Sequence, residues 1–298
     1  MAGAGEGQAR AELIDRLTAD VLHQLASTPE PRLRSVLLEL VRHLHAFVRE
    51  VQLSQAELMT VVRFLTEVGQ ACNEARQEFV LLSDTLGVSS LVELVEHGSD
   101  DKRVTAPTIV GPFYVPESPW RENGSSMAAP GEPGQRCLLE GRVLSADASP
   151  LPGAVLDIWQ TSAAGYYAVQ RPEELGSTNL RGRYRAKADG SYQVRTVRPV
   201  PYAIPDDGPV GRLLRMSGRH PMRAAHIHLK VTADGHLPLT THIFDAESDY
   251  LETDTVFGVR TSLIRDFTPD GHGGVRCQFD VVLEPRTAYG PGDRSSAP

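Results

Sequence analysis

The feature that most constrains the fold is a change in sequence pattern near Asp100. Before it, apolar residues recur at three- and four-residue spacing, which is the period of one face of an α-helix. One such stripe comprises Leu33, Leu37, Leu40, Leu44 and Val48. After it, Pro and Gly become frequent, and short β-rich runs alternate with turns. We therefore predict an α+β protein, with a helical domain over residues 1–103 and an antiparallel β-sandwich over residues 104–298.

Local signals refine this division. Ser54 followed by Glu57 predicts a capping box, in which each side chain bonds the other residue's backbone N–H at the start of a helix. The irregular, turn-rich joins between strands favour a sandwich over βαβ units. The Pro/Gly-rich stretch 198–218 is predicted to be a long connection. The predicted strands span residues 136–144, 154–161, 184–187, 191–197, 226–232, 239–244 and 275–283.

Composition and charge exclude several classes of protein. The 298 residues carry a formal net charge of −8 and no run of Lys and Arg, which argues against nucleic acid or an anionic membrane as a partner. No apolar run approaches the roughly 20 residues that span a bilayer, and the N-terminus lacks the apolar core of a signal peptide. Cys72, Cys137 and Cys277 are far apart and indicate reduced thiols. We expect a cytoplasmic protein without a membrane span.

The sharpest local motif is His226-Ile-His228. On a strand, residues i and i+2 point to the same face, so both imidazoles can reach one metal ion. A purely structural pair is one interpretation, and a cupin site would need a Glu that the following residues lack. A ferrous site of two histidines and a carboxylate could use Asp234. A zinc site of three histidines could use His242 from the next strand.

Two tyrosines add a further alternative. Tyr167 follows Gly165 just past the strand 154–161, and Tyr202 lies in the Pro-rich loop 199–205. A free phenol has a pKa near ~10 and is a poor ligand while neutral, but a trivalent cation stabilises the phenolate. Mixed phenolate and imidazole ligands therefore suit Fe(III) better than Zn(II). Taken singly, each tyrosine is better explained by packing.

Seven short motifs occur in a fixed order between Thr108 and His228. They are Thr108-Ile-Val-Gly-Pro-Phe-Tyr114, Leu156-Asp-Ile-Trp-Gln-Thr161, Gly165-Tyr-Tyr167, Asp189-Gly-Ser-Tyr192, Pro201-Tyr-Ala-Ile-Pro205, Gly218-Arg-His220 and Arg223-Ala-Ala-His-Ile-His228. From about Glu78 to Phe257 the sequence thereby resembles the intradiol ring-cleaving dioxygenases, the catechol and hydroxyquinol 1,2-dioxygenase group. The preceding helices resemble the helical linker domain of that family.

The resemblance implies an Fe(III)-dependent intradiol dioxygenase with one Fe(III) per subunit. The implied metal ligands are Tyr167, Tyr202, His226 and His228. Tyr167 is preferred over Tyr166 because the family spacing is Gly-x-Tyr. The implied catalytic residues are Tyr202 as a base, Arg223 beside the substrate, and His242, which stands where catechol enzymes are expected to have Gln.

The same resemblance implies a substrate pocket of the hydroxyquinol branch. A carboxylate at Asp84 can accept a hydrogen bond from the third hydroxyl of hydroxyquinol (1,2,4-trihydroxybenzene), which catechol lacks. The implied reaction is intradiol cleavage of hydroxyquinol by O2 to 3-hydroxy-cis,cis-muconate, the enol of maleylacetate, in aromatic compound catabolism. Catechol and chlorocatechol are the alternative substrates. The implied pocket residues are Leu81, Asp84, Ile109, Val110, Gly111, Pro112, Phe113, Ile204, Pro205, Arg223 and Val256.

The resemblance also implies a homodimer that pairs through the N-terminal helices, often with a phospholipid between the subunits. Residues 1–103 would then be a dimerisation domain, and residues 104–298 the catalytic domain that carries Fe(III). Two rival interpretations stay open. Stretches such as Glu140-Gly-Arg-Val-Leu144 also resemble prealbumin-like binding modules, which need none of these ligands. A zinc hydrolase or lyase built on His226, His228 and His242 leaves both tyrosines unexplained.

Overall fold

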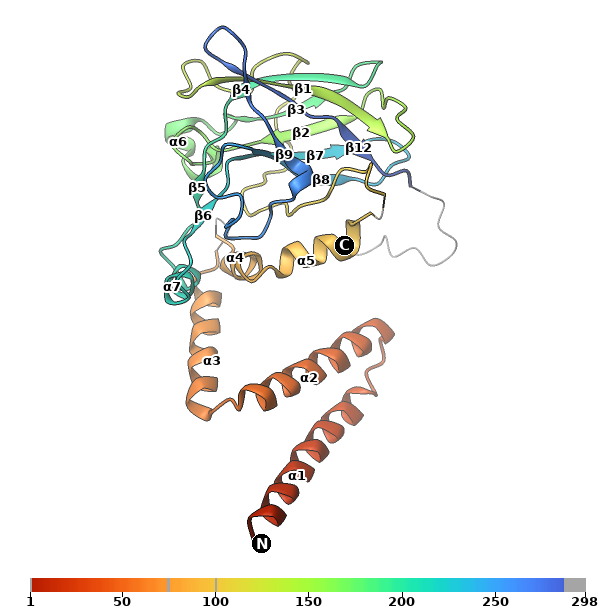
Figure 1. Cartoon of the computed structure of the whole chain (residues 1–298), viewed down its shortest axis with the longest axis vertical. Helices are drawn as coiled ribbons and strands as arrows, with labels where there is room; N and C mark the ends of the chain where they lie inside the picture. The colour runs from red at the N-terminus through yellow and green to blue at the C-terminus, as the bar shows by residue number, and fades with distance from the viewer. Residues whose placement is uncertain (1, 74–75, 100, 287–298) are drawn as a thin grey trace. The chain divides into compact units, whose positions relative to one another are not determined.

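The computed structural model describes residues 2–73, 76–99 and 101–286. The chain divides at Thr66 and Glu67 into two compact units, whose helices and strands are labelled in Figure 1. The predicted architecture, helices first and a β-rich domain after them, is confirmed. None of the helices in the described ranges combines the length and the apolar character needed to cross a membrane.

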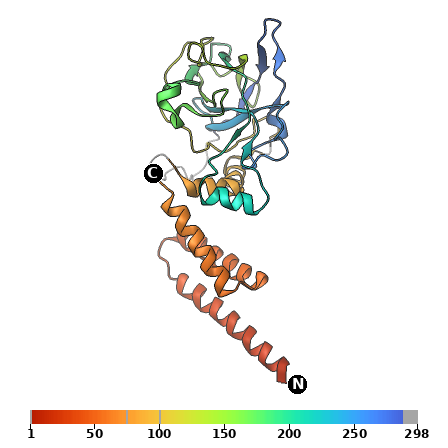
Figure 2. The same ribbon diagram turned by 90° about the vertical axis from the view of Figure 1, so that its left-hand side faces the viewer.

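The first unit consists of helices. α1 (Ala2–Leu25) and α2 (Pro31–Val51) are joined by a short turn and pack against each other (Figure 2). Thr18 Oγ1 of α1 lies 2.9 Å from His45 Nδ1 of α2. α2 begins at a proline, whose fixed φ and missing N–H suit the first position of a helix.

The predicted capping box at the start of the third helix is confirmed. α3 (Gln55–Gln70) crosses from the first unit into the second. The backbone N–H of Ser54 donates to the Glu57 carboxylate at 2.8 Å, and the backbone N–H of Glu57 donates to Ser54 Oγ at 3.3 Å. Two N–H groups that would otherwise lack partners are thereby satisfied.

Two five-stranded sheets form most of the second unit. One sheet has the order β10–β11–β1–β12, with β4 also paired to β1. Its strands are β1 (Arg136–Ser145), β4 (Ser191–Val197), β10 (Thr268–Pro269), β11 (Val275–Gln278) and β12 (Val281–Leu283). The other has the order β3–β2–β7–β8–β9. Its strands are β2 (Val155–Trp159), β3 (Arg181–Arg185), β7 (His226–Thr232), β8 (Leu239–Asp245) and β9 (Ile264–Arg265).

The sheets are mixed rather than strictly antiparallel, which corrects the predicted strand direction. β4 pairs antiparallel with β1, whereas β11 and β12 both pair with β1 in parallel, and β9 is parallel to β8. Parallel neighbours require a crossover connection, and here the whole second sheet lies in sequence between β1 and β11. The single strand predicted over 275–283 is two strands, because the Phe279 carbonyl leaves the ladder and accepts a hydrogen bond from Tyr192 Oη at 2.6 Å.

Both sheets contribute to one hydrophobic core, which confirms the sandwich. Side chains on alternate positions of the strands point inward and are buried, as expected for two sheets packed face to face. From the first sheet these are Leu139, Val143, Tyr192, Val194, Cys277 and Val281. From the second they are Leu156, Ile158, Tyr184, Ile227, Leu229 and Ile243.

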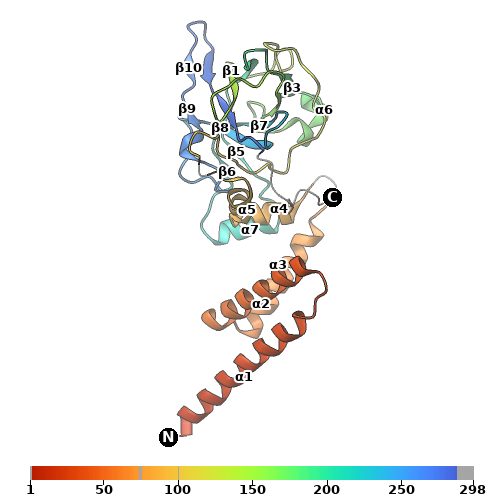
Figure 3. The same cartoon turned by 90° about the vertical axis from the view of Figure 1, so that its right-hand side faces the viewer.

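Helices α4, α5 and α7 gather at one end of the sandwich, near the two-stranded ribbon of β5 and β6 (Figure 3). Their bounds are α4 (Glu78–Thr85), α5 (Val88–His97), α7 (Pro209–Met216), β5 (Tyr202–Ala203) and β6 (Met222–Arg223). α7 lies within the stretch that was predicted as a connection. It forms because Pro209 occupies its first turn and the Glu78 carboxylate accepts a hydrogen bond from Val210 N at 3.0 Å.

Candidate functional site

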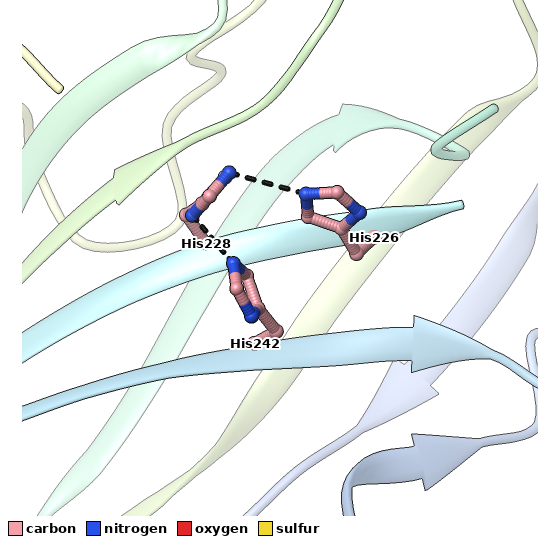
Figure 4. A group of neighbouring side chains, drawn as sticks. All are labelled: His226, His228 and His242. Carbon is pink, nitrogen blue, oxygen red and sulfur yellow. Dashed lines mark hydrogen bonds between the residues drawn. The ribbon is translucent and has the colours of Figure 1, made fainter. Parts of the chain in front are cut away.

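Three histidines lie together on two neighbouring strands. His226 and His228 are two residues apart on β7 and point to the same face, as the strand period requires (Figure 4). β8 runs antiparallel to β7 and places His242 opposite His228. All three imidazoles are at most 2% exposed, and each can offer a nitrogen within 4.8 Å of the others.

Tyr167 and Tyr202 reach the same place from two other segments. Tyr167 follows β2 by way of a turn at Gly165, where φ is +80°. A Cβ at Gly165 would lie only 3.2 Å from the Cβ of Tyr202. Tyr202 belongs to β5, where it pairs with Arg223 of β6. The glycine therefore permits the close approach of two buried phenols.

Four side-chain atoms converge on one point. Tyr167 Oη lies 3.0 Å from Tyr202 Oη and 2.8 Å from His228 Nε2. His226 Nε2 lies 3.1 Å from His228 Nε2. Atoms bonded to one metal ion at about 2 Å are about 3 Å from one another. The spacing is therefore that of a ligand set around a single ion.

Tyr166, the neighbour of Tyr167, stands apart from this group. Tyr166 is 36% exposed, and the guanidinium of Arg171 lies over its ring at 3.5 Å from the ring centroid. Of the two adjacent tyrosines, Tyr167 is the one that faces the histidines.

Burial controls protonation in the group. It lowers the pKa of His226 and His228 well below the ordinary value, and the charge of Arg223 adds to the effect. Both imidazoles are therefore neutral and keep a lone pair for a metal. Burial also raises the pKa of Tyr167 well above its ordinary value. This phenol ionises at neutral pH only beside a compensating positive charge, so the donor set suits a highly charged cation.

Hydrogen bonds indicate which imidazole nitrogens are free. His226 Nδ1 lies 2.6 Å from the Ala224 carbonyl oxygen, so Nδ1 carries the proton and Nε2 keeps its lone pair. His242 Nε2 lies 2.8 Å from His228 Nδ1, the ring nitrogen that does not face His226 (Figure 4). The His242 ring also contacts that of His226, with 4.6 Å between centroids, but its Nε2 bonds the back of His228 rather than one of the four converging atoms.

Arg223 borders the group and is held by a residue that the sequence did not suggest. Its Nη1 lies 3.2 Å from His226 Nε2 and 3.4 Å from Tyr202 Oη. The Asp254 carboxylate accepts two hydrogen bonds from Arg223, each 3.2 Å long, and both side chains are buried. Asp254 lies in an irregular segment without a spacing motif, so only the tertiary structure identifies it.

Some predicted pocket residues share one small cavity. Leu81, Pro112, Phe113 and Pro205 line a cavity of about 30 Å³, and Arg76, Gln77 and Glu78 complete its wall. The Phe113 ring stacks on Tyr167, with 4.9 Å between ring centroids. One wall residue of the cavity therefore contacts Tyr167.

The other predicted pocket residues do not line that cavity. Asp84 is 3% exposed, and burial raises its pKa, although the charge of Arg223 opposes this. Gly111 has φ +77°, and a Cβ there would lie 3.5 Å from His228 Cε1. Ile109, Ile204 and Val256 are buried, and Val110 is half-buried.

Comparisons with known proteins identify the family of this chain. Residues 30–103 match the family described as catechol dioxygenase N terminus, and residues 109–285 match the family described as dioxygenase. The 6-chlorohydroxyquinol 1,2-dioxygenase of Cupriavidus pinatubonensis is 45% identical over 90% of this chain and 96% of its own length. The hydroxyquinol 1,2-dioxygenase of Rhizobium sp. is 42% identical over 85% of each chain.

Solved structures give the same result. The hydroxyquinol 1,2-dioxygenase of Pseudomonas putida matches with a TM-score of 0.87 and 39% identity, over 92% of this chain and 99% of its own. The catechol 1,2-dioxygenase of Acinetobacter matches with a TM-score of 0.77 and 28% identity, over 89% and 92%. The chain therefore belongs to the intradiol ring-cleavage dioxygenases, a family of enzymes that use non-haem iron.

Proposed function

We propose that this enzyme cleaves hydroxyquinol between its two adjacent hydroxyl-bearing carbons. It adds both atoms of O2 and forms 3-hydroxy-cis,cis-muconate, the enol of maleylacetate, in aromatic compound catabolism. The observation that carries the proposal is the convergence of two phenols and two imidazoles on one point. Relatives named hydroxyquinol 1,2-dioxygenase, at 41–44% identity, support the choice of substrate.

We propose Fe(III), one per subunit, as the ion and Tyr167, Tyr202, His226 and His228 as its ligands. The spacing of their donor atoms and the neutral imidazoles fit one ion. The buried phenol of Tyr167 favours a trivalent ion over zinc, because phenolate needs strong charge compensation. When bound, Fe(III) supplies the Lewis acidity that draws electron density from the substrate ring and makes the ring reactive toward O2.

Two residues of the chain handle charge and protons in this proposal. Tyr202, as phenolate, accepts a proton from a substrate hydroxyl. Arg223, whose Nη1 lies 3.4 Å from Tyr202 Oη, stabilises negative charge that builds on the ring. Its pairing with Asp254 keeps the guanidinium oriented toward Tyr202 and His226.

His242 is assigned a positioning role. By accepting the proton of His228 Nδ1, it leaves His228 Nε2 free to bind the metal. This differs from a direct contact with the substrate, because its Nε2 faces the back of His228.

Asp84 is proposed to select the substrate. Its buried carboxyl would hydrogen-bond the third hydroxyl of hydroxyquinol, and catechol would leave it without that partner. The difference amounts to about 1–3 kcal/mol. The remaining pocket residues, which give shape rather than charge, are Leu81, Ile109, Val110, Gly111, Pro112, Phe113, Ile204, Pro205 and Val256.

Colour and oxygen uptake test the proposal. Tyrosinate bound to Fe(III) absorbs visible light, so iron-loaded protein should be wine-red, and hydroxyquinol should be consumed faster than catechol or chlorocatechols. Colourless protein with stoichiometric zinc would contradict the proposed ligands. Fastest turnover of catechol would leave the metal site in place and reject Asp84 as the selecting residue.

We also propose a cytoplasmic homodimer with a phospholipid between subunits. In this assignment residues 1–103 form the dimerisation domain and residues 104–298 the catalytic domain. The gap between the two family matches, at residues 104–108, supports this boundary. Exposed apolar side chains on α2, including Leu44 and Phe47, support pairing through the helices. Three free cysteines fit a reducing compartment.

A further inference from the structure

A column of aromatic rings runs from His228 in the candidate metal site to Tyr114, a half-buried residue. Trp159 of β2 stacks on His228, with 4.6 Å between ring centroids and 12° between planes. Tyr114 packs on Trp159, with 4.8 Å between centroids. Trp159 is 4% exposed, whereas Tyr114 is half-buried. Ring contact therefore continues without a break from a proposed metal ligand to a residue that solvent reaches.

The outer ring of this column has a partner for its proton. Tyr114 Oη donates to Asp157 Oδ2 at 3.1 Å, and Asp157 is 6% exposed. Burial raises the pKa of Asp157, which makes its carboxylate a better proton acceptor. Burial and the charge of Asp157 raise the pKa of Tyr114 to about 12, so the phenol keeps its proton until it is oxidised.

The inner ring lacks such a partner. Trp159 Nε1 is buried and has no hydrogen-bond partner among the described residues. An oxidised Trp159 therefore keeps its proton and remains a cation in a site that disfavours charge. Lys230 Nζ lies 5.1 Å from the centroid of the Tyr114 ring, and its charge disfavours a radical cation there too. Oxidation of Tyr114 therefore requires the loss of its phenolic proton. The neutral Tyr114 radical is then more stable than the Trp159 radical cation.

We propose that Trp159 and Tyr114 form an electron-transfer path that protects the site from oxidation by peroxide. This inference rests on the proposed metal site. A one-electron oxidant that hydrogen peroxide generates at the iron site takes an electron from Trp159. Tyr114 then reduces oxidised Trp159 by one electron and transfers its phenolic proton to the Asp157 carboxylate. The products are a neutral Tyr114 radical and protonated Asp157. A thiol or ascorbate in solution then supplies one electron, and Asp157 returns the proton.

Conservative variants separate this function from simple packing. Tyr114→Phe keeps the ring against Trp159 but has no proton to lose, and Asp157→Asn keeps an acceptor oxygen that is a much weaker base. Tyr250→Phe is the matched control, because Tyr250 contacts His220 and lies outside the column.

Freeze-quench EPR of iron-loaded enzyme treated with hydrogen peroxide tests the path. The wild type and Tyr250→Phe should give a tyrosyl radical signal, whereas Tyr114→Phe and Asp157→Asn should lose it. Tyr114→Phe should start with unchanged ring-cleavage activity and then be inactivated faster by peroxide. Absence of the signal from the wild type, or an unchanged signal in Tyr114→Phe, would overturn the proposal.

A second arm separates failure of the path from failure of the metal site. In metal-free, full-length protein carrying Trp120→Phe, azide radicals from pulse radiolysis oxidise the remaining tryptophan, Trp159. Its radical absorption should convert into that of a tyrosyl radical, and Tyr114→Phe should abolish the conversion. Unchanged conversion in Tyr114→Phe would reject the ring-to-ring step whatever metal the site binds.

Discussion

At the scale of single residues, the position of one proton decides whether His228 can bind a metal ion. With the proton on Nδ1, shared with His242 Nε2 over 2.8 Å, the lone pair of Nε2 faces Tyr167 and His226. The reverse tautomer places the proton on Nε2, which then has no lone pair to bind a metal ion. We therefore propose that His242 acts on the metal through His228.

Variants of His242 test this role. In His242→Leu, His228 loses its acceptor, and iron affinity should fall about 10- to 100-fold. His242→Gln restores a carbonyl oxygen and should retain most of the affinity. Iron retained after dialysis against a chelator measures the effect, and the tyrosinate band reports the ligand set. Equal loss of iron from both variants would reject the role.

A second prediction at this scale concerns Asp84. Burial raises its pKa in the folded protein, so the folded state binds a proton more tightly than the unfolded state. Stability is therefore lost as pH rises from the ordinary Asp range through the raised pKa, and the loss is complete above it. Asp84→Asn removes this penalty. It should be more stable than the wild type at neutral pH in urea denaturation, with the difference shrinking in acid.

The same substitution should weaken discrimination between hydroxyquinol and catechol, which oxygen uptake measures as the ratio of kcat/KM values. For the stability prediction, Asp101→Asn is the control. Arg103 lowers the pKa of Asp101 to about 2, so the ionised Asp101 carboxylate stabilises the folded state, whereas ionised Asp84 destabilises it. Its stability should fall at neutral pH. A destabilised Asp84→Asn at neutral pH would contradict the argument.

A site residue can be predicted from the sequence when it belongs to a short motif. Alternation along one strand places His226 and His228 on a common face, so their proximity follows from local structure. Asp254 is different, because its contact with Arg223 joins segments 31 residues apart in the sequence. Such a pair leaves no local pattern, and only the fold brings it together.

At the scale of elements, the type and approximate position of the longer helices and strands were predictable, but their exact bounds and pairing direction were not: the strand predicted over 184–187 is β3 at Arg181–Arg185. Periodicity indicates whether a segment is a strand, but it does not indicate which strand that segment pairs with or in which direction. β11 and β12 therefore read as one strand, although they pair in parallel with successive parts of β1. α7 escaped prediction because it begins within a Pro/Gly-rich stretch, and its first turn is stabilised from another helix by Glu78.

The junction of β11 and β12 yields a prediction for Gly141 of β1. A Cβ at this position would lie 1.9 Å from the Phe279 carbonyl oxygen, which belongs to rigid backbone. Gly141→Ala should therefore lower the free energy of unfolding by about 3 kcal/mol or more. The control is Gly69→Ala in α3, where a Cβ meets only Phe79 at 3.5 Å and should be neutral or stabilising by up to about 1 kcal/mol. Urea denaturation compares the two, and equal stabilities would contradict the argument.

At the scale of the whole molecule, the two units differ in how they bury apolar surface. The second unit encloses its own core between two sheets. In the first, α2 has no buried residue in the single chain. Its exposed apolar side chains are Leu33, Val36, Leu40, Leu44, Phe47, Val48 and Val51. A surface of this kind is typical of an interface, so we expect a second copy of the chain to cover this face of α2.

A charge placed on this surface should separate the copies. Phe47 is 52% exposed in the single chain, and burying one Phe stabilises by about 1.5–3 kcal/mol. A two-fold interface contains it twice, so Phe47→Lys should raise the dimer dissociation constant by roughly 100-fold or more. Ala46→Lys, on the polar stripe with Glu39 and Glu50, is the matched control and should remain dimeric. Light scattering after size-exclusion chromatography measures both. A monomeric wild type, or a Phe47→Lys variant that stays dimeric, would show that this face of α2 is not the interface.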